Sequence, residues 1–539
     1  MHNFATMIRK SLLVFIIACG ACLFHTVQAV ANHVSEARII ATTDVHGSYF
    51  PYDFIQDRPI SGSLAHVETY LKGQRRLYGN RLVYVDLGDI LQGQPCAYYY
   101  NIHPETRHLA ADILNYMGCS IGLLGNHEIE TGTKVFSRYV SEVGFPILGA
   151  NILMDSTNDN YLPPYKIIEI DGMRIAFLGM TTPAIPSWLP KMLWESVHFT
   201  DMKQCARQWV AYLKEHEHPD AIIGLFHAGE SGGIVTADYT ENQTEEIARE
   251  VVGFDAIIYG HDHRVNCRLI TNTAGKEVVI INPANQARSV ASLTLKKENG
   301  KIMVAAETVS MKDLVADSAF ISTFTPQMET VKRYVSKRIG TFAAPADSRD
   351  ALQGPSAFVD LVHQLQLSLT GADVSITAPL SLSARIDSGD VCVCDMFKLY
   401  RYENMLYTML LTGKEIKDHL EMSYDMWINH QGATYNYDSA AGIIYDVHTT
   451  QPKGSRIEIK SMADGSPFSP DKQYKVAINS YRGNGGGELL TKGAGIAKQD
   501  LPKRIIASTD RDLRYYLMDY IERAKTITPR ALNQWRFVD

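Results

Sequence analysis

Five short polar clusters, each placed directly after an apolar run, are the most informative feature of this sequence. They combine aspartate, asparagine and histidine, a mixture of oxygen and nitrogen ligands that suits Mn, Zn, Fe or Co better than Ca. Two divalent cations about 3.5–4 Å apart clamp the attacking and departing oxygens of an in-line displacement at phosphorus. The clusters therefore predict a two-metal phosphoesterase site. They are Asp44-Val45-His46, Gly88-Asp89, Gly125-Asn126-His127-Glu128, His227 and Gly260-His261-Asp262-His263.

The spacing within the clusters indicates how the ligands are shared between two cations. Asp44 and His46 lie two apart on a segment predicted to be extended, so both side chains should face the same way. His261 and His263 have the same spacing, and each can serve one metal. Asp89 follows a small glycine and is the natural shared ligand, because a carboxylate bridges two cations well. Taken alone, each cluster has a structural explanation, and their occurrence together indicates metal. The predicted ligands are Asp44, His46, Asp89, Asn126, His227, His261 and His263.

Length and composition limit the classes of protein that fit. The chain has 539 residues, which is too many for one hydrophobic core and suits two domains or more. A hydrophobic content of 45% and a charged content of 21% are ordinary for a globular protein. The net charge of −7 provides no electrostatic footprint for a polyanion, so we expect no nucleic acid polymer as a partner.

The N-terminus has the features of an export signal. Arg9 and Lys10 precede the apolar run 11–24, and the small-residue exit 27–29 follows it. This run is short for a membrane span. We therefore predict a signal peptide over residues 1–31 and a periplasmic product. A competing interpretation places Cys19, or less convincingly Cys22, at the mature N-terminus as a lipid-modified residue, which would anchor the protein at the cell envelope.

The rest of the chain divides into two α/β parts. From about residue 37 to 311, short β-branched runs alternate with helical stretches, and the polar clusters follow the runs. Continuous apolar runs are typical of strands buried on both faces, and open α/β sheets build their sites beyond the carboxyl ends of such strands. Residues 313–340 resemble one long charged helix that Gly340 and Pro345 end. The predicted division is signal peptide 1–31, metal-bearing domain 34–312, linker helix 313–345 and C-terminal domain 346–539.

These motifs resemble the calcineurin-like metallophosphoesterase superfamily, and the mature chain resembles its two-domain 5′-nucleotidase branch. The resemblance implies a four-layer α/β/β/α sandwich, followed by a C-terminal α/β domain that binds the nucleoside. It implies that His127 does not bind metal but donates to the phosphoryl oxygens in the transition state. Glu130 stands where the 5′-nucleotidases have an aspartate that orients this histidine. The implied ligand sets are Asp44, His46, Asp89 and His263 for one metal, and Asp89, Asn126, His227 and His261 for the other.

The resemblance also implies where the base binds. An asparagine-aromatic loop that ends in glycines supplies one ring, which matches Tyr481 in the segment 479–487. The second ring matches Tyr437, with Tyr435 as a close competitor. Stacking on an aromatic face tolerates every base and contributes roughly 1–3 kcal/mol per base. Asn404 fits the branch as a further substrate contact, and Arg385 is the sole arginine of a loosely matched loop.

Several segments favour one part of this branch. They are 41–47 with 51–53, 399–406 and 479–485, and they resemble the periplasmic 2′,3′-cyclic-nucleotide 2′-phosphodiesterase/3′-nucleotidases. We therefore rank hydrolysis of 2′,3′-cyclic nucleotides and 3′-nucleotides first and hydrolysis of 5′-nucleotides second. A nucleotide-sugar hydrolase and a non-catalytic binding or adhesion protein are further alternatives. The sequence leaves the native metals, the base preference and the oligomeric state open.

Overall fold

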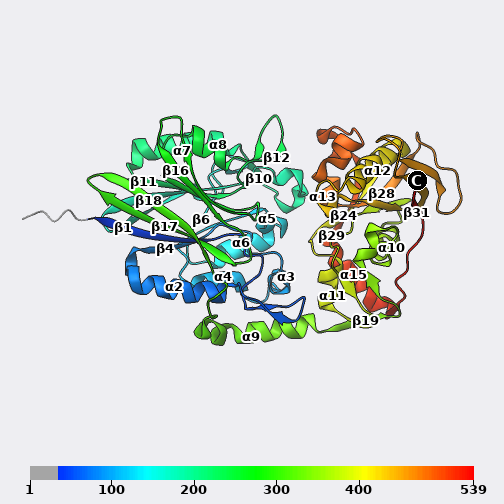
Figure 1. Ribbon diagram of the computed structural model, residues 1–539, viewed down its shortest axis with the longest axis horizontal. Coiled ribbons are helices and arrows are strands. Elements are labelled where there is room, and N and C mark those ends of the chain that lie inside the picture. The colour runs from blue at the N-terminus through cyan, green and yellow to red at the C-terminus, as the bar shows by residue number, and fades with distance from the viewer. Residues whose placement is uncertain (1–33) are drawn as a thin grey trace, which may run out of the picture.

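The computed structural model describes residues 34–539, and the predicted signal peptide lies outside the described residues. Two domains lie side by side, and helix α9 (Ser318–Val335) runs along one edge of the molecule from the first to the second (Figure 1). None of the helices within residues 34–539 is both long and apolar enough to cross a membrane.

The first domain contains two six-stranded sheets. Strands β1, β4, β5 and β6 of the first sheet are parallel, and β17 and β18 complete it in antiparallel pairing. In the second sheet β9, β11, β14 and β16 are parallel, between antiparallel edges β8 and β15. In spatial order the first sheet is β18 (Lys301–Ser310), β17 (Ser289–Glu298), β1 (Ser35–Thr42), β4 (Leu82–Asp86), β5 (Ile121–Leu123) and β6 (Ile147–Leu148). The second is β15 (Val265–Thr271), β16 (Glu277–Pro283), β14 (Ala256–Tyr259), β11 (Ala221–His227), β9 (Met173–Thr181) and β8 (Tyr165–Ile170).

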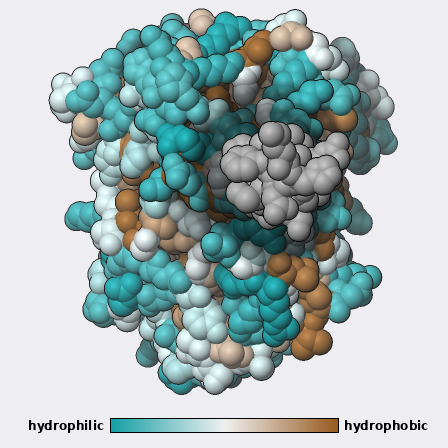
Figure 2. Space-filling model, turned by 90° about the vertical axis from the view of Figure 1, so that its left-hand side faces the viewer, coloured by the Kyte–Doolittle hydropathy of each residue, from teal (hydrophilic) through white to brown (hydrophobic). Residues whose placement is uncertain are grey.

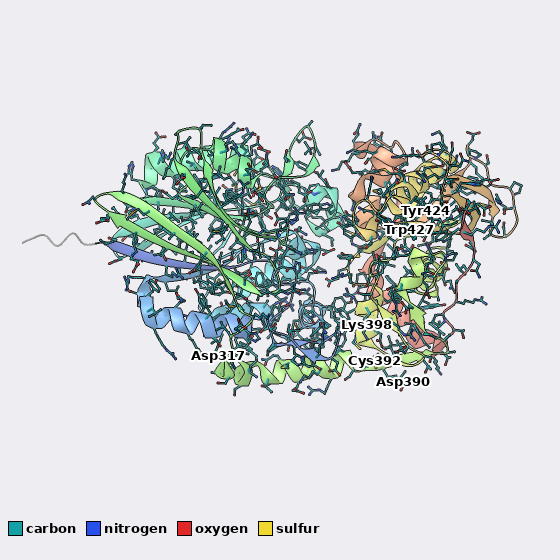
Figure 3. All side chains as sticks on the ribbon, viewed as in Figure 1. Asp317, Asp390, Cys392, Lys398, Tyr424 and Trp427 are labelled. Atoms are coloured by element: carbon teal, nitrogen blue, oxygen red, sulfur yellow. The ribbon has the colours of Figure 1, made fainter. Side chains whose placement is uncertain are left out.

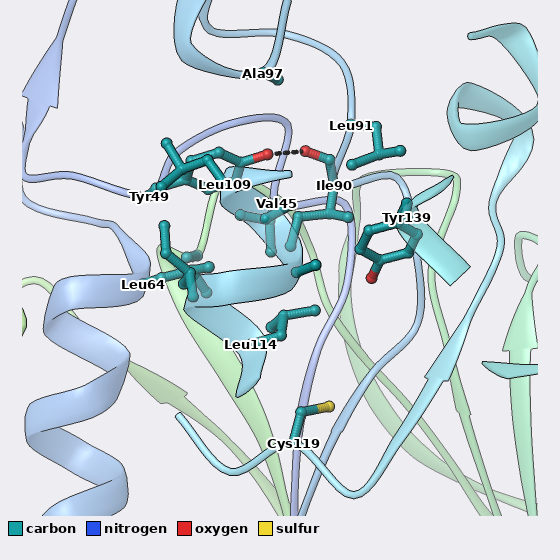
Figure 4. Packing of buried hydrophobic residues seen from close by; sticks show 14 of the residues in the cluster. Val45, Tyr49, Leu64, Ile90, Leu91, Ala97, Leu109, Leu114, Cys119 and Tyr139 are labelled. Atoms are coloured by element: carbon teal, nitrogen blue, oxygen red, sulfur yellow. Dashed lines mark hydrogen bonds between the residues drawn. The ribbon is translucent and has the colours of Figure 1, made fainter. Parts of the chain in front are cut away.

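The apolar strands pack on both faces, as their sequences predict. One core lies between the two sheets, where Ile39 and Val85 meet Ile223 and Ile258. Helices α2 (Leu64–Tyr78) and α4 (Leu109–Tyr116) cover the outer face of the first sheet, and α7 (Met202–Tyr212) and α8 (Thr244–Glu250) cover the second. Figure 4 shows the packing under α4, where the Tyr49 hydroxyl donates to the Ile90 carbonyl at 2.8 Å. These four layers confirm the predicted fold class.

The connecting helix is shorter than predicted. It ends at Val335, and the following segment forms strand β19 (Arg338–Phe342), which pairs with β23 (Gly389–Cys392) and β30 (Thr526–Ile527). Gly340 therefore lies inside a strand, where an added Cβ would meet the Ile521 side chain at 2.6 Å, instead of ending the helix. Phe320, Phe324 and Val331 bury one face of α9 in the core of the first domain.

The second domain is also built of helices and sheets. Its five-stranded sheet has the order β25 (Ser439–Ala441), β21 (Val374–Thr377), β28 (Gln473–Asn479), β24 (Met405–Thr412) and β29 (Ile505–Asp512). Helices α10 (Ala357–Thr370), α12 (Gly413–Ile428) and α15 (Leu513–Ala524) pack around this sheet. The face of the first domain that points away from the second is mainly hydrophilic where it is visible (Figure 2).

Candidate metal centre

The loops that carry the predicted ligands gather beyond the strand ends of both sheets. The Asp44 amide donates to the Gly88 carbonyl and the His46 amide to the Asp89 carbonyl, both at 2.9 Å, which ties the loop after β1 to the loop after β4. The Asp44 carboxylate in turn accepts from the His261 amide at 2.9 Å, so the third loop joins them. Segments far apart in the sequence thus form one centre.

The backbone of this centre is strained. Five predicted ligands have positive φ, a region that residues other than glycine rarely adopt. Such residues cost of order 1–3 kcal/mol each and cluster at functional sites. The predicted extended segment from Asp44 to His46 is therefore wrong, although both side chains still reach one cluster. The φ angles are 51° for Asp44, 48° for His46, 55° for Asp89, 76° for His261 and 59° for His263.

The first cluster consists of Asp44, His46 and His263, whose ligand atoms all lie within 4.8 Å of one another. The Nε2 atoms of the two histidines are 3.0 Å apart, and His263 Nε2 is 3.2 Å from Asp44 Oδ1. Burial lowers the pKa of His46 to about 4, so its imidazole is neutral at pH 7. Gln92 Oε1 lies 3.1 Å from the other ring nitrogen of His46 and fixes the ring.

The second cluster consists of Asp89, His227 and His261. His227 donates through Nδ1 to the Leu87 carbonyl at 2.8 Å, which directs its Nε2 toward Asp89 Oδ2 at 3.1 Å. Asn126 Oδ1 lies 3.3 Å from the same nitrogen. Burial opposes a charge on His227, but the Asp89 carboxylate raises the pKa of His227 to about 9. The structure thus brings all seven predicted ligands into two adjoining groups.

Glu128 organises the loops and was not among the predicted site residues. Its fully buried carboxylate accepts four backbone N–H groups, from Asp89 at 2.6 Å, Ile90 at 2.8 Å, Leu91 at 2.9 Å and Gly125 at 2.7 Å. One side chain therefore fixes both the turn that presents Asp89 and the turn before Asn126. The sequence signal was present, because Glu128 closes the same polar cluster as Asn126.

His127 lies beside the two clusters and belongs to neither. Its Nδ1 donates to Glu130 Oε2 at 2.5 Å, so the structure brings together the pair that the sequence suggested. Burial opposes a charge on this ring, but the Asp89 and Glu130 carboxylates raise the pKa of His127 to about 10. A protonated imidazole next to the clusters can donate a hydrogen bond to an anionic ligand.

A cavity of about 570 Å³ lies between the domains. The first domain contributes His127, His261 and Trp188 to its wall, and the second contributes Tyr435 and Tyr481. The two tyrosine rings meet edge to face, with centroids 6.1 Å apart and planes at 88°. This arrangement supports stacking on one ring at a time, since the rings are not parallel. Asn404 also lines this cavity.

Two predicted substrate contacts lie elsewhere. Tyr437 is only 4% exposed and stacks on Trp427 at 5.6 Å, and Trp427 stacks on Tyr424 at 5.2 Å in the core of the second domain (Figure 3). The competitor Tyr435, in contrast, lines the cavity. Arg385 pairs with Asp387 at 2.6 Å on the exposed surface and is absent from the described residues that line the cavity. Neither side chain lines the cavity, because Tyr437 packs on Trp427 and Arg385 forms a local ion pair with Asp387.

A buried arginine connects the two tyrosine loops. Arg482, 2% exposed, pairs with Asp438 at 2.8 Å. Its guanidinium also donates to the backbone carbonyl of Tyr435 at 2.9 Å, to Asn436 Oδ1 at 3.1 Å and to the Gly486 carbonyl. The loop that carries Tyr435 is therefore tied to the residue that follows Tyr481 in the chain. No pattern in the sequence predicts this connection.

Comparison with known proteins follows the division seen in the structure. Residues 37–265 match the calcineurin-like phosphoesterase family, and residues 338–492 match the 5′-nucleotidase C-terminal domain. A 2′,3′-cyclic-nucleotide 2′-phosphodiesterase/3′-nucleotidase of Haemophilus influenzae is 26% identical over 93% of this chain and 87% of that relative. A trifunctional nucleotide phosphoesterase of Bacillus subtilis is 27% identical over 95% of this chain, which spans 39% of that longer protein.

The fold has a solved counterpart. A Staphylococcus aureus protein described as a 5′-nucleotidase superposes with a TM-score of 0.79 at 22% identity, covering 93% of this chain and 100% of that one. This likeness shows the fold alone, and the two family matches confirm the resemblance seen in the sequence. The chain therefore combines a calcineurin-like phosphoesterase domain with a 5′-nucleotidase C-terminal domain.

Proposed function

We propose that this enzyme hydrolyses 2′,3′-cyclic nucleotides and 3′-nucleotides to nucleoside and phosphate. One observation carries the proposal: a single cavity is lined by His127 and His261 from the first domain and by Tyr435 and Tyr481 from the second. Reactive groups and aromatic rings thus face the same space. A non-catalytic binding or adhesion protein would not need the full set of ligands that this chain retains.

Divalent cations fit the two clusters by the chemistry of the donors. Within residues 34–539, buried Asp44 Oδ1 accepts no hydrogen bond, and the Nε2 atoms of His46 and His263 approach each other at 3.0 Å. A cation placed between such groups would satisfy all three. Bound there, two cations would polarise phosphate oxygens and lower the pKa of a water. We assign Asp44, His46 and His263 to one cation and Asn126, His227 and His261 to the other, with Asp89 shared; Mn, Zn, Co and Fe all suit these ligands.

The remaining residues bind and orient the substrate. His127 donates to a phosphoryl oxygen as negative charge develops there. Glu130 orients this imidazole through Nδ1, and because Glu130 belongs to neither cluster, its carboxylate stays available to His127 when cations are bound. Tyr481 and Tyr435 hold the base, and Asn404 contacts the nucleoside from the same wall.

The choice of phosphate position rests on the relatives. Proteins named 2′,3′-cyclic-nucleotide 2′-phosphodiesterase/3′-nucleotidase are 24–26% identical to this chain and match at 87–91% of their own length. A 5′-nucleotidase of Vibrio vulnificus is 22% identical. Hydrolysis of 5′-nucleotides is therefore the second candidate, and the same metal centre would serve it. Nucleotide-sugar hydrolysis ranks below both.

We further propose that the enzyme is exported. The proposal rests on the basic residues, apolar run and small-residue exit within residues 1–31, and it places the enzyme in the periplasm or on a lipid anchor at the envelope. Mass spectrometry of the N-terminus of the secreted protein would test it. Cleavage after Ala29 or Ala31 supports a free periplasmic form, and an acylated Cys19 supports the anchor.

The activity is tested by measuring phosphate and nucleoside release from 2′,3′-cyclic AMP, 3′-AMP and 5′-AMP in parallel. We expect turnover of the first two with Mn²⁺ and none with EDTA. A preference for 5′-AMP would move the enzyme to the second candidate and leave the metal assignment intact. Absence of metal-dependent turnover of all three would refute the proposed function.

A further inference from the structure

A second cavity adjoins the centre, and His127 and Tyr402 lie between it and the cavity already described. These two residues line both cavities. The second cavity has a volume of about 420 Å³ and borders the first cluster through His46 and His263. The cavity lined by Tyr435 and Tyr481 (the aromatic cavity) borders the second cluster through Asn126 and His261. A reacting phosphate at the clusters would therefore have room on two sides.

The wall of the second cavity is polar and rich in donors. Ser381, Ser383 and Gln92 line it, and Gln92 is 6% exposed and meets His46 through Oε1, which leaves its amide NH₂ without a partner in the described chain. One oxygen of the Asp53 carboxylate, Oδ1, accepts from the backbone amides of residues 55 and 56 and from Gln94. The wall thus offers donors at Ser381, Ser383 and Gln92, and Asp53 supplies the one carboxylate among its described residues.

Two basic side chains, Lys398 and Arg401, also line this cavity, and they differ in how their charge is balanced. Lys398, on the edge of the second domain that faces the first (Figure 3), donates to Asp395 at 2.9 Å, so its charge is compensated. Arg401 lies over the Tyr402 ring at 5.8 Å and makes no hydrogen bond or ion pair with the described part of the chain. Its guanidinium is available for an anion such as a phosphate, which it binds in a bidentate manner.

The shape of a nucleotide matches two cavities that border the same metal centre. In a ribonucleotide the base on C1′ and the 5′-carbon on C4′ project from the same face of the ring but diverge from its two ends, and O2′ and O3′ lie on the other face. With the 3′-phosphate at the clusters and the base against Tyr481, C5′ is directed away from the aromatic cavity. A mononucleotide with a free 5′-hydroxyl would leave the second cavity (the polar cavity) empty.

We propose that the polar cavity is a subsite for a 5′-phosphate and that Arg401 binds it, which makes nucleoside 3′,5′-bisphosphates preferred substrates. The inference rests on the proposed function and names its substrate class more closely. Water adds to the 3′-phosphorus, the P–O3′ bond breaks and O3′ takes up a proton. The products are a nucleoside 5′-phosphate and inorganic phosphate, so the 5′-phosphate anchors the substrate and is not cut.

The test compares kcat/KM for adenosine 3′,5′-bisphosphate with that for 3′-AMP, at fixed metal and ionic strength. A hydrogen-bonded charge contributes enough to make the bisphosphate about tenfold better in the wild type. We expect this ratio to fall to about one in Arg401→Gln. The matched control is Arg511→Gln, an exposed arginine over Tyr515 at 5.5 Å and outside both cavities, which should keep the wild-type ratio.

A wild-type ratio of one or less would overturn the inference, as would an unchanged ratio in Arg401→Gln. Release of 3′-AMP from the bisphosphate would also overturn it, because the 5′-phosphate would then be the group cut. These results leave hydrolysis of 3′-AMP itself intact. Turnover of 5′-AMP without turnover of 3′-AMP would instead refute the proposed function, and the inference with it, so the two failures are distinguishable.

Discussion

Alanine substitutions at Tyr435 and Tyr437 should affect different properties, although the two residues are only two positions apart in the sequence. Tyr435 is 38% exposed and lines the cavity between the domains. Tyr437 is 4% exposed and stacks on Trp427 at an interplanar angle of 12°. We therefore expect Tyr435→Ala to weaken nucleotide binding and Tyr437→Ala to destabilise the second domain.

The magnitudes follow from these environments. Stacking contributes roughly 1–3 kcal/mol per base, and because the Tyr435 and Tyr481 rings meet edge to face, we take the lower part of that range. About 1–2 kcal/mol corresponds to a 5- to 30-fold rise in KM. Truncating a buried aromatic ring costs about 3–5 kcal/mol. For Tyr437→Ala this lowers the unfolding midpoint by roughly 6–20 °C.

The assay separates the two effects with a pair of substrates. KM is measured for 3′-AMP and for 4-nitrophenyl phosphate, which lacks a nucleoside, and thermal unfolding is followed for each variant. Tyr435→Ala should raise KM for 3′-AMP alone and keep the wild-type midpoint. Tyr435→Phe is the control, because it retains the ring and should retain most of the affinity.

Two results would contradict this reasoning. A rise in KM for 3′-AMP in Tyr437→Ala, with an unchanged unfolding midpoint, would return the base contact to Tyr437. An equal rise in KM for both substrates in Tyr435→Ala would show that this ring acts on the reacting phosphate and not on the base.

Three further predictions concern the metals, the loop connection and pH. Asp89→Asn should lower kcat/KM at least about 100-fold and the metal content by mass spectrometry, while unchanged metal content would refute its assignment as a ligand. Arg482→Lys, which loses the forked contacts, should raise KM for 3′-AMP roughly tenfold but not for 4-nitrophenyl phosphate; an equal rise for both would contradict the connection to Tyr435. Burial lowers the pKa of His363 to about 3 between the Ser375 and Ser439 hydroxyls. As pH falls, the unfolded chain therefore takes up a proton on this imidazole before the folded chain does. The contribution of His363 to the free energy of unfolding is thus complete above pH 6.5, the ordinary pKa of histidine, and is lost as pH falls toward 3. His363→Gln should flatten the fall in urea-unfolding free energy between pH 6.5 and 4, and an identical slope would refute the assignment.

The grouping of the proposed metal ligands was predictable because each of these residues lies next to an apolar strand in the sequence. Asp44, Asp89 and His261 each follow an apolar strand directly, and parallel strands bring their carboxyl ends to one edge of a sheet. The identity of the side chains and their order therefore predicted the centre. The backbone that presents them was not predictable in this way, since positive φ at Asp44 and His46 depends on hydrogen bonds to the loop after β4.

The base contact and the second cavity depended on the tertiary structure. Tyr435 and Tyr437 have similar neighbours in the sequence, and only the position of Trp427 on α12 decides which ring is buried. Arg401 and His46 come from different domains, so no pattern along the chain places them around one space. Local sequence specifies which side chains are reactive and which strands and helices carry them. The packing of the two domains decided which surfaces face each other, because that depends on contacts between residues hundreds of positions apart.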